Sequence, residues 1–528
     1  MGLARTYAIG LVGLDGHLIE VEAHIAPGLP GFTLIGLPDA VLYEARDRVR
    51  AAVINSGLKW PDRRMTVSLS PASLHKRGSS FDLALACAIL GAGGAVPKSA
   101  LADMVLVGEL GLDGRVRSVP GVLPAVLAAV RAGMKRVVVP APNRAEAELV
   151  PDASVSDVRS LPELVALLGG EPFGDDATPD FEQVVDEPVS GGGGPALSHP
   201  PAALDYPPDL ADVCGQADAR KALEVTAAGG HHLFLQGPPG AGKTMLAERL
   251  PGILPALDLE AALEVTSIHS VAGLLPPDRP LLTRPPFANP HHTATVVAIV
   301  GGGSSLLRPG AVSLAHHGVL FLDEAPEFRA GVLDSLRQPM ESGEVVIARA
   351  QAVARFPARF QLVMAANPCP CGQGDSAELL CACPSVVRRR YLARLSGPLL
   401  DRVDLRVTVD RPSRADLLAI GTGEPTASVA DRVLVARERA AQRLAGTPWR
   451  INAQLPAREL RGRFAPKPGA LATVEAAMSR GELSARGLAR VLRVAWTLAD
   501  LSGVDRPGSE QVGVAFALRA GRFAGLAA

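Results

Sequence analysis

The sequence predicts two α/β domains followed by a helical region, and three observations carry this prediction. Residues 1–168 alternate between strand-like and helix-like hydrophobic patterns, and so do residues 206–410. Residues 411–528 show helix-like patterns only. Between the two α/β regions, residues 169–205 are acidic and rich in Gly and Pro, which predicts a flexible linker. The length of 528 residues fits several domains.

The charge of the chain is balanced overall but uneven along it. The formal net charge is −1, so no gross excess points to a nucleic-acid partner. Residues 388–528, however, hold 24 Lys and Arg against 13 Asp and Glu, whereas residues 160–219 hold twelve acids and no Lys or Arg. The chain therefore has a basic C-terminal part and an acidic middle.

No segment of the sequence predicts export or membrane insertion. The first residues read as a strand, and the longest apolar run, residues 83–97, is too short and glycine-rich to span a bilayer. Four of the six cysteines lie within residues 369–383, whereas Cys87 and Cys214 stand alone. The cysteine distribution favours a protein of the reducing cytoplasm with a cysteine cluster that binds metal. The lack of a long apolar run predicts no membrane contact.

Individual elements can be read in order along the chain. Residues 64–71 and 134–140 read as strands, and the stretch from Pro38 to Gly57 reads as a helix that a proline opens and a glycine ends. In the C-terminal region, three stretches read as helices, namely 428–446, 468–481 and 484–503.

A glycine-rich loop follows the apolar strand Leu233–Leu235 and precedes a helical pattern. The loop comprises Gly237, Pro238, Pro239, Gly240, Ala241, Gly242, Lys243 and Thr244. Glycines let backbone N–H groups turn towards phosphate oxygens, and the helix N-terminus adds the positive end of its dipole. With both flanks in place, the motif predicts a nucleotide-binding P-loop rather than a chance turn. Lys243 would reach the β- and γ-phosphates of ATP, and the Thr244 hydroxyl would bind Mg²⁺.

A second buried strand, Val319–Leu322, ends in Asp323 and Glu324. Asp323 can hold Mg²⁺, and Glu324 can polarise an attacking water. Alone, such a strand would more simply end in solvated acids, but the P-loop that precedes it favours the catalytic interpretation. The next apolar strand ends in Asn367, whose amide could orient the same water. The sequence therefore predicts that ATP and Mg²⁺ bind here.

The order of these parts resembles that of the AAA+ ATPases, and more narrowly their magnesium-chelatase/MCM branch. After Asn367 come the segment "SGPLLDRVDL" and a helix that bears arginines. The resemblance implies that Asn367 is the sensor 1 residue and that Arg402 is an arginine finger for a neighbouring subunit. It also implies sensor 2 at Arg486, with Arg490 as the alternative; solvated helix faces are an equal interpretation for Arg490 and Arg493. A finger that acts in trans implies a homo-oligomeric ring, in this family usually a hexamer.

Residues 341–361 read as a hairpin, with Arg349 near its tip and Arg355 and Arg359 behind. The hairpin lies just before Asn367, where related ATPases insert a hairpin that lines the pore of the ring. Arginine suits contact with a phosphate backbone, so Arg349 and Arg355 are predicted DNA contacts. An ordinary surface hairpin is the alternative.

The cysteine cluster consists of two C-x-C pairs, Cys369 with Cys371 and Cys381 with Cys383. Four thiolates are the number that a tetrahedral structural Zn²⁺ takes, and core packing does not explain paired cysteines in "CPCGQGD". Four reduced thiols without metal are the alternative. Three pairs of adjacent histidines are weaker candidates, because adjacent side chains point apart and one metal cannot easily use both. These pairs are His231-His232, His291-His292 and His316-His317.

The combination resembles the ComM/YifB family of magnesium chelatase-like proteins over nearly the whole chain. The resemblance rests on residues 286–328, on the cysteine pairs after Asn367 and on "LSGPLLDRVDL". It implies a hexameric DNA helicase that promotes branch migration when incoming single-stranded DNA is integrated during transformation. Two alternatives stay open: the motor of a true magnesium chelatase, and a scaffold whose assembly ATP controls.

The N-terminal region resembles the Lon protease domain, an S5-like α/β fold, in "SPASLHKRGSSFDLALACAIL" and "VGELGLDGRVRSVPGVLPAV". Lon-type hydrolysis needs a serine nucleophile and a lysine base within hydrogen-bond reach. Ser80 matches the serine, but Leu123 stands where the lysine should be, and the next lysine along the chain is Lys135. The resemblance therefore implies a proteolytically inactive domain that serves ring assembly or DNA contact, as in RecA-like recombination proteins.

Overall fold

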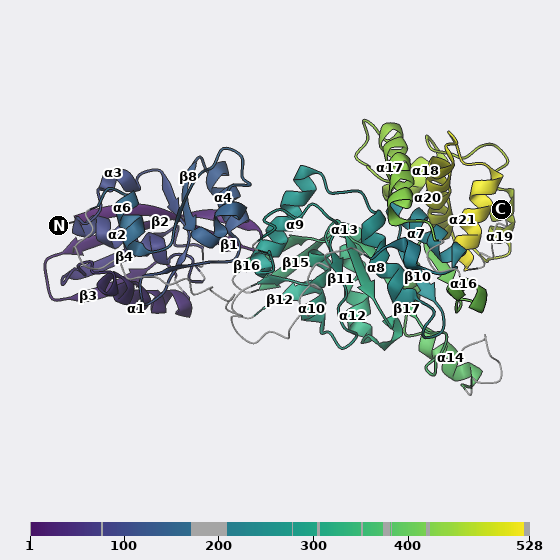
Figure 1. Ribbon diagram of the computed structural model, residues 1–528, viewed down its shortest axis with the longest axis horizontal. Helices are drawn as coiled ribbons and strands as arrows, with labels where there is room; N and C mark the ends of the chain where they lie inside the picture. Colours follow the sequence, from purple (N-terminus) through teal and green to yellow (C-terminus); the bar gives the residue numbers. More distant parts are fainter. Residues whose placement is uncertain are drawn as a thin grey trace.

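The computed structural model describes most of the chain. The described residues are 2–37, 39–74, 76, 78–170, 208–276, 278–303, 307–349, 352–372, 381, 383–418 and 423–521. Figure 1 shows an elongated molecule with the N-terminal domain at one end, the P-loop domain in the middle and a helical region at the other end. Nearly all of the linker predicted at 169–205 lies outside the described residues. None of the described helices is long and apolar enough to cross a membrane.

The N-terminal domain is built on a seven-stranded mixed sheet. In spatial order its strands are β3 (Gly31–Ile35), β4 (Arg64–Ser70), β2 (Asp15–Ala26), β1 (Gly2–Val12), β5 (Met104–Leu106), β8 (Arg136–Pro140) and β9 (Ser154–Val158). Helix α2 (Asp82–Gly93) forms the core, because nearly all its residues are buried. The strands predicted at 64–71 and 134–140 are confirmed as β4 and β8.

The first helix, α1 (Ala40–Asn55), begins slightly later than predicted. Asp39 is its N-cap, and the Asp39 carboxylate accepts a hydrogen bond from the Leu42 N–H at 2.9 Å. A capping carboxylate satisfies one of the unpaired N–H groups of the first turn, so the helix begins after the aspartate rather than at the proline before it. The predicted end at Gly57 is close to the observed one.

The P-loop domain holds a five-stranded parallel sheet. The spatial order is β11 (Phe287–Ala288), β14 (Val319–Leu322), β17 (Gln361–Ala366), β10 (Leu233–Gln236) and β18 (Leu405–Thr408). Strand β14 has the predicted bounds, and all four of its residues are buried. Alternate residues of β14, β17 and β10 enter two different apolar clusters, so both faces of the sheet are covered at these strands. The carboxyl ends of β14, β17 and β10 meet at one edge.

The helical region packs against one face of this sheet. Its main helices are α17 (Thr426–Arg443), α19 (Ala472–Ser479), α20 (Ala485–Ser502) and α21 (Ser509–Ala520), and the first three confirm the predicted helices. Their apolar side chains share one core with helices α7 (Ala217–Gly229) and α8 (Lys243–Ile253). The P-loop domain and the helical region are therefore joined by a common hydrophobic core.

Asp404, immediately before β18, ties the helical region to the sheet. Its carboxylate lies 2.8 Å from the Arg490 guanidinium of α20 and accepts the His232 N–H at 3.1 Å. Although burial opposes the charge, the His231 ring, whose Nδ1 lies 3.6 Å away, and the charge of Arg490 hold the pKa of Asp404 well below its usual value. Asp404 is 2% exposed, so removal of its charge would leave a buried guanidinium unpaired.

The N-terminal domain contacts the P-loop domain through helices α4 (Val122–Arg131) and α9 (Leu259–Ala272). The Gly121 N–H, at the start of α4, donates to the Ser270 carbonyl and hydroxyl oxygens at 3.1 and 3.0 Å. The Ser270 hydroxyl in turn donates to Glu146 of the N-terminal domain. The contact is thus hydrogen-bonded as well as apolar.

The stability of the helical region depends on Asp404. We expect Asp404→Asn to lower its free energy of unfolding by about 3 kcal/mol, because the change breaks a buried pair and leaves the Arg490 charge in place. The measurement is urea unfolding followed by Trp449 and Trp496 fluorescence in a Trp60→Phe background. The control is Asp410→Asn at an exposed position, where a change within about 0.5 kcal/mol is expected. Equal losses in the two variants would contradict the assigned role.

Candidate functional site

The P-loop joins β10 to α8, and its glycines fit the space available. The backbone of Gly237 passes so close to the end of β18 that a Cβ atom there would lie 2.0 Å from the Val409 carbonyl oxygen. Gly242 is the N-cap of α8 and has a φ of +85°, a left-handed conformation that favours glycine. Any side chain at these two positions would displace the loop.

Lys243 is the centre of the hydrogen-bonding network in the loop. Its ammonium donates to the carbonyl oxygens of Gly237 at 2.7 Å and Pro238 at 2.9 Å, and to the Asn367 side-chain oxygen at 3.1 Å. Lys243 is only 8% exposed, and burial lowers its pKa. The structure thus brings the P-loop lysine and Asn367, predicted from separate motifs, into direct contact.

Thr244 and Asp323 also meet. The Thr244 hydroxyl donates to the Asp323 carboxylate at 2.6 Å, which joins the start of α8 to the end of β14. Hydroxyl and carboxylate oxygens are hard ligands of the kind that Mg²⁺ prefers, so the donor set at this junction fits that ion. The two predicted magnesium ligands lie side by side.

Glu324 points into a more open region. It is half-exposed, and its carboxylate lies 3.5 Å from the His292 ring Nδ1. Its φ of +50° is uncommon for a residue with a side chain and costs conformational energy. The Glu324 backbone N–H donates to the Asp323 carboxylate at 2.9 Å, which ties the backbone of this turn to Asp323.

A cavity of about 670 Å³ lies beside the P-loop and was not predicted from the sequence. Gln216 connects the two, because its side-chain amide donates to the Ala241 carbonyl of the loop and to the Asp410 carbonyl at 3.0 Å. Gln216 has a φ of +57° at the start of α7. The wall also includes Val213, Gly215 and Arg432 of α17. The Gly-Gln pair just before a helix is the sequence signal that could have indicated this turn.

The predicted arginines fall into two groups. Arg402 does not contact the P-loop of its own chain in the described residues; it pairs with Glu341 and donates to the Pro398 carbonyl at 2.7 Å. Arg486 is exposed on α20. One interpretation placed Arg490 and Arg493 on a solvated helix face, and it is wrong. Arg490 pairs with Asp404, and Arg493 donates to the Leu455 carbonyl at 2.7 Å. Arg490 thus reaches the residue before β18, whereas Arg493 binds within the helical region.

The predicted hairpin is present as β15 (Glu344–Arg349) and β16 (Ala352–Pro357). Arg349 lies in the last pair before the turn, and Arg355 pairs with Glu344 at 3.1 Å in an exposed ion pair. The inner face of the hairpin is apolar: Ala354 and Phe356 are buried against Leu11, Val12 and Leu14 of the N-terminal domain. The hairpin is therefore clamped to a second domain at its base, which the sequence did not reveal.

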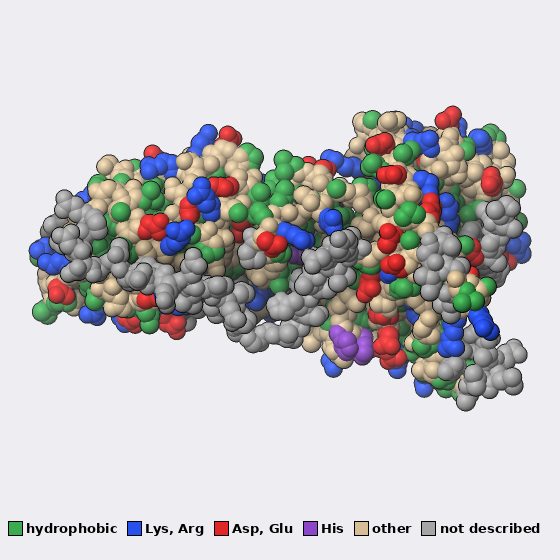
Figure 2. Space-filling model, viewed as in Figure 1, with side chains coloured by type: hydrophobic (Ala, Val, Ile, Leu, Met, Phe, Trp, Pro, Cys, Tyr) green, Lys and Arg blue, Asp and Glu red, His purple; other side chains and the backbone are tan. Residues whose placement is uncertain are grey.

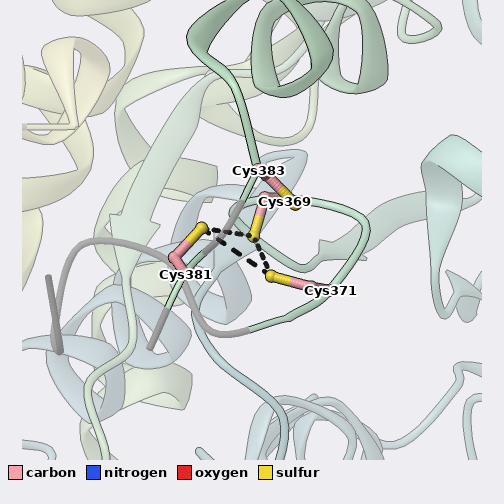
Figure 3. A group of neighbouring side chains, drawn as sticks. All are labelled: Cys369, Cys371, Cys381 and Cys383. Carbon is pink, nitrogen blue, oxygen red and sulfur yellow. Dashed lines mark hydrogen bonds between the residues drawn. The ribbon is translucent and has the colours of Figure 1, made fainter. Parts of the chain in front are cut away.

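The four clustered cysteines converge, as Figure 3 shows. Their sulfur atoms all lie within 4.8 Å of one another, and none forms a disulfide. The Cys369–Cys381 and Cys371–Cys381 sulfur distances are both 3.7 Å, and the Cys369–Cys371 distance is 3.2 Å. The cluster lies against the P-loop, because a Cβ atom at Gly372 would come 2.5 Å from the Pro239 ring.

One expectation about the histidine pairs is wrong. Adjacent side chains were expected to point apart, yet His316 and His317 both reach the same Glu264 oxygen, at 3.0 and 3.2 Å. The reason is the left-handed backbone at His317, where φ is +56°. The Arg359 N–H donates to His316 Nδ1 at 2.9 Å, so His316 Nε2 keeps its proton for Glu264. These hydrogen bonds lower the pKa of Glu264 and form a clamp around it, and the ligand atoms of the three side chains lie within 4.8 Å of one another, close enough to hold a metal ion.

In the N-terminal domain, the position expected for a catalytic lysine has another use. Leu123 is fully buried, and its backbone N–H donates to the Glu146 carboxylate at 2.8 Å. Lys76 is closer to Ser80 in the sequence than Lys135 is, but its buried ammonium donates to the carbonyl oxygens of Gly36 and Pro71. No hydrogen bond joins Lys76 to Ser80 among the described residues.

Three family descriptions match successive parts of the chain. "Subunit ChlI of Mg-chelatase" matches residues 21–143, "Magnesium chelatase, subunit ChlI" matches residues 209–417, and "Magnesium chelatase, subunit ChlI C-terminal" matches residues 423–519. The residues between the first two matches include the predicted linker.

Several relatives are similar over almost the whole length. A Mycobacterium tuberculosis protein of uncharacterised function is 52% identical over 98% of this chain and 99% of its own. Competence protein ComM of Haemophilus influenzae is 41% identical, with 95% and 94% covered, and YifB of Escherichia coli is 40% identical, with 96% and 94% covered. The Lon protease of Trichlorobacter lovleyi is 30% identical over 28% of this chain and 19% of its own. The chain therefore belongs to the ComM/YifB family of magnesium chelatase-like AAA+ ATPases, with a Lon-like region at its N-terminus.

Proposed function

We propose that this ATPase is a hexameric DNA motor of the cytoplasm that promotes branch migration while incoming DNA is integrated. The observation that carries the proposal is the similarity over 95% of the chain to a relative whose name assigns it to competence. Branch migration is what the resemblance to the ComM/YifB family implies, and it requires a motor that hydrolyses ATP. The contacts among Lys243, Thr244, Asp323 and Asn367 support the requirement for ATP hydrolysis.

Hydrolysis follows from the chemistry of these side chains. Backbone N–H groups of the loop and the Lys243 ammonium bind the phosphates, after Lys243 leaves the carbonyls that it now contacts. Thr244 and Asp323 hold Mg²⁺, which supplies charge neutralisation on the phosphate oxygens. Glu324 polarises the attacking water, and Asn367 orients it. The adenine base binds in the cavity next to Gln216, a placement supported by the position of the cavity beside the loop and by its polar and apolar walls.

The remaining arginines complete the proposed ring. Arg402 acts as the arginine finger for the neighbouring subunit, and its pairing with Glu341 holds the side chain until the neighbour binds. Arg486 acts as sensor 2, since Arg490 is engaged by Asp404. Arg349 and Arg355 of the hairpin contact the DNA backbone in the pore. The N-terminal domain, residues 1–168, serves as an inactive Lon-like scaffold, consistent with a buried Leu123 at the lysine position.

A magnesium-chelatase motor is the second candidate, and the family descriptions favour it. Such a motor would insert Mg²⁺ into a porphyrin together with partner subunits. The cysteine cluster is atypical of chelatase motors and counts against it, and so does the Lon-like region, although a chelatase description also matches residues 21–143. The dependence of the ATPase rate on DNA separates the DNA motor from the chelatase motor. It also separates the DNA motor from an assembly scaffold.

The cysteine cluster fits a structural Zn²⁺. Four sulfurs bound tetrahedrally at about 2.3 Å lie roughly 3.8 Å from one another. Two of the three sulfur distances given above, 3.7 Å each, agree with that spacing. Bound zinc would tie together the two ends of the segment between Cys371 and Cys381. Cys369, Cys371, Cys381 and Cys383 are the proposed ligands.

Replacement of the P-loop lysine tests the nucleotide site. We expect Lys243→Ala to reduce ATP hydrolysis to the blank rate, because the phosphates lose their only side-chain cation in the loop. The far-UV circular dichroism spectrum should stay unchanged. Lys467→Ala, at an exposed lysine of the helical region, is the control and should keep full activity. Normal turnover by Lys243→Ala would disprove the site assignment.

The DNA dependence of the ATPase tests the function. We expect single-stranded, forked or four-way-junction DNA to raise the steady-state ATPase rate, because a translocating motor couples hydrolysis to its track. The rates are compared with those without DNA and with linear duplex, at several salt concentrations, with Lys243→Ala as the blank. A rate that no DNA changes at any salt concentration would rule out the DNA motor and favour the chelatase or scaffold alternative.

The metal content tests the cysteine cluster. We expect the purified protein to release about one zinc ion per chain when a thiol-reactive reagent is added, followed with a zinc-sensitive dye. Replacement of Cys371 and Cys381 by serine should abolish the release, whereas Cys214→Ser, outside the cluster, should not change it. Protein without metal after preparation in zinc-containing medium would contradict the proposed ligands.

A further inference from the structure

Helix α14 (Ser385–Leu392) is a basic element that the sequence analysis did not single out. Its sequence, SVVRRRYL, contains three consecutive arginines and no acidic residue. In Figure 1 it lies at the periphery of the P-loop domain, away from the N-terminal domain. Figure 2 shows Lys and Arg side chains gathered on the surface of this part of the molecule. The helix is thus a projecting feature with positive charge.

The two faces of α14 differ in character. Arg389 and Arg390 follow Val386 by three and four positions, so each lies beside Val386 on the helix surface, and all three are exposed; Val386 is 63% exposed. The opposite face carries Tyr391, the one residue of the described helix that is buried, and is continued by buried Leu395 after its end. The helix is anchored through the second face and presents the first to a partner.

Both ends of α14 are fixed to the functional site. At its N-terminal end, Cys383 of the cysteine cluster stands two residues before Ser385. At its C-terminal end, Arg394 pairs with Glu327 at 3.0 Å and donates to the Pro326 carbonyl. Glu327 ends the short helical turn that follows Asp323 and Glu324. The Arg394–Glu327 ion pair therefore connects α14 to the turn that follows strand β14.

Tyr391 reinforces this link. It is buried beside Arg394, whose guanidinium lies 6.0 Å from the centre of the Tyr391 ring. Burial, with smaller contributions from the charges of Glu327 and Glu324, raises the pKa of Tyr391 to about 12. The tyrosine thus lies within electrostatic reach of Glu327 and of the proposed catalytic Glu324.

We propose that α14 is a DNA-contacting element, in which Arg389 and Arg390 bind backbone phosphates and the cysteine cluster holds the helix beside the nucleotide site. The inference rests on the proposed function, since it requires that DNA be the track. Guanidinium groups suit phosphate oxygens, and exposed Val386 supplies apolar contact with the sugars. The Arg389 and Arg390 side chains diverge by about 100° around the helix axis, so the two guanidinium groups can reach separate phosphates.

The test compares two double variants of the full chain. Arg389→Gln/Arg390→Gln removes the proposed contacts, and Arg458→Gln/Arg461→Gln removes the same charge from exposed positions of α18 (Ala457–Arg461). Fluorescence anisotropy with labelled dT40 and with a forked duplex gives the affinity, and ATPase assays give basal and DNA-stimulated rates. Zinc content and circular dichroism establish that the cluster and the fold are intact in both.

For the α14 variant we expect at least tenfold weaker DNA binding, lost stimulation at limiting DNA and an unchanged basal rate. The slope of log affinity against log salt should fall by about 1 for each arginine. Arg389→Lys/Arg390→Lys should restore most of the affinity, since lysine keeps the charge. Wild-type-like binding by the glutamine variant, with the wild type stimulated by DNA, would overturn this inference alone. A wild type that binds no DNA would overturn it together with the proposed function.

An acidic protein partner is the competing interpretation, and the same variants address it. Poly-glutamate serves as the probe in place of DNA. If the glutamine variant loses poly-glutamate binding while its DNA affinity and stimulation stay at the wild-type level, α14 is a protein-docking helix and the inference is wrong. Loss of DNA binding by the α14 variant, with the Arg458→Gln/Arg461→Gln variant unaffected, supports the DNA contact.

Discussion

The parallel pairing of β10 with β17 on one side and β18 on the other is the constraint on which the nucleotide site depends. The register aligns Gln236 with both Ala366 and Thr408, so the three strands end at one level. The P-loop and Asn367 therefore begin at the same edge, and Lys243 reaches a residue 124 positions later in the chain. On the other side of β10, β18 follows directly after Asp404, and Asp404 binds Arg490 of the helical region.

Prediction from the sequence worked where a single stretch carries its own limits. Strand β14 was predicted with its observed bounds because four apolar residues stand between a glycine and two acids. It failed where the backbone departs from the common conformations: His317 and Gln216 both have positive φ, and neither the Glu264 clamp nor the cavity follows from a regular pattern. The inward ties of Arg490 and Arg493 also escaped prediction, because helical spacing alone does not show which neighbour a helix packs against.

The arginine excess of the C-terminal region is partly used inside the protein. Arg443 pairs with Asp500, contacts Asn452 at 2.7 Å and lies 4.2 Å from the centre of the Trp496 ring. Arg437 donates to the Ala227 carbonyl of α7, and burial lowers its pKa to about 10. The planar guanidinium suits such buried contacts better than a lysine ammonium does. A surplus of basic residues is therefore not by itself a footprint of DNA; their exposure has to be known, as on α14.

The buried carboxylate of Glu146 has a mechanical meaning. It accepts hydrogen bonds from Leu123 in its own domain and from Ser270 in α9, so separation of the two domains would remove the Ser270 donor from a buried carboxylate. The hydrogen bonds from Gly121 to Ser270 and from Ser270 to Glu146 therefore resist sliding of the two domains past each other. Strand β3 lies at the far end of the N-terminal domain from this joint (Figure 1). Because that edge lies farthest from the joint, any rotation that α9 passed to the N-terminal domain would displace it more than any other part of the domain.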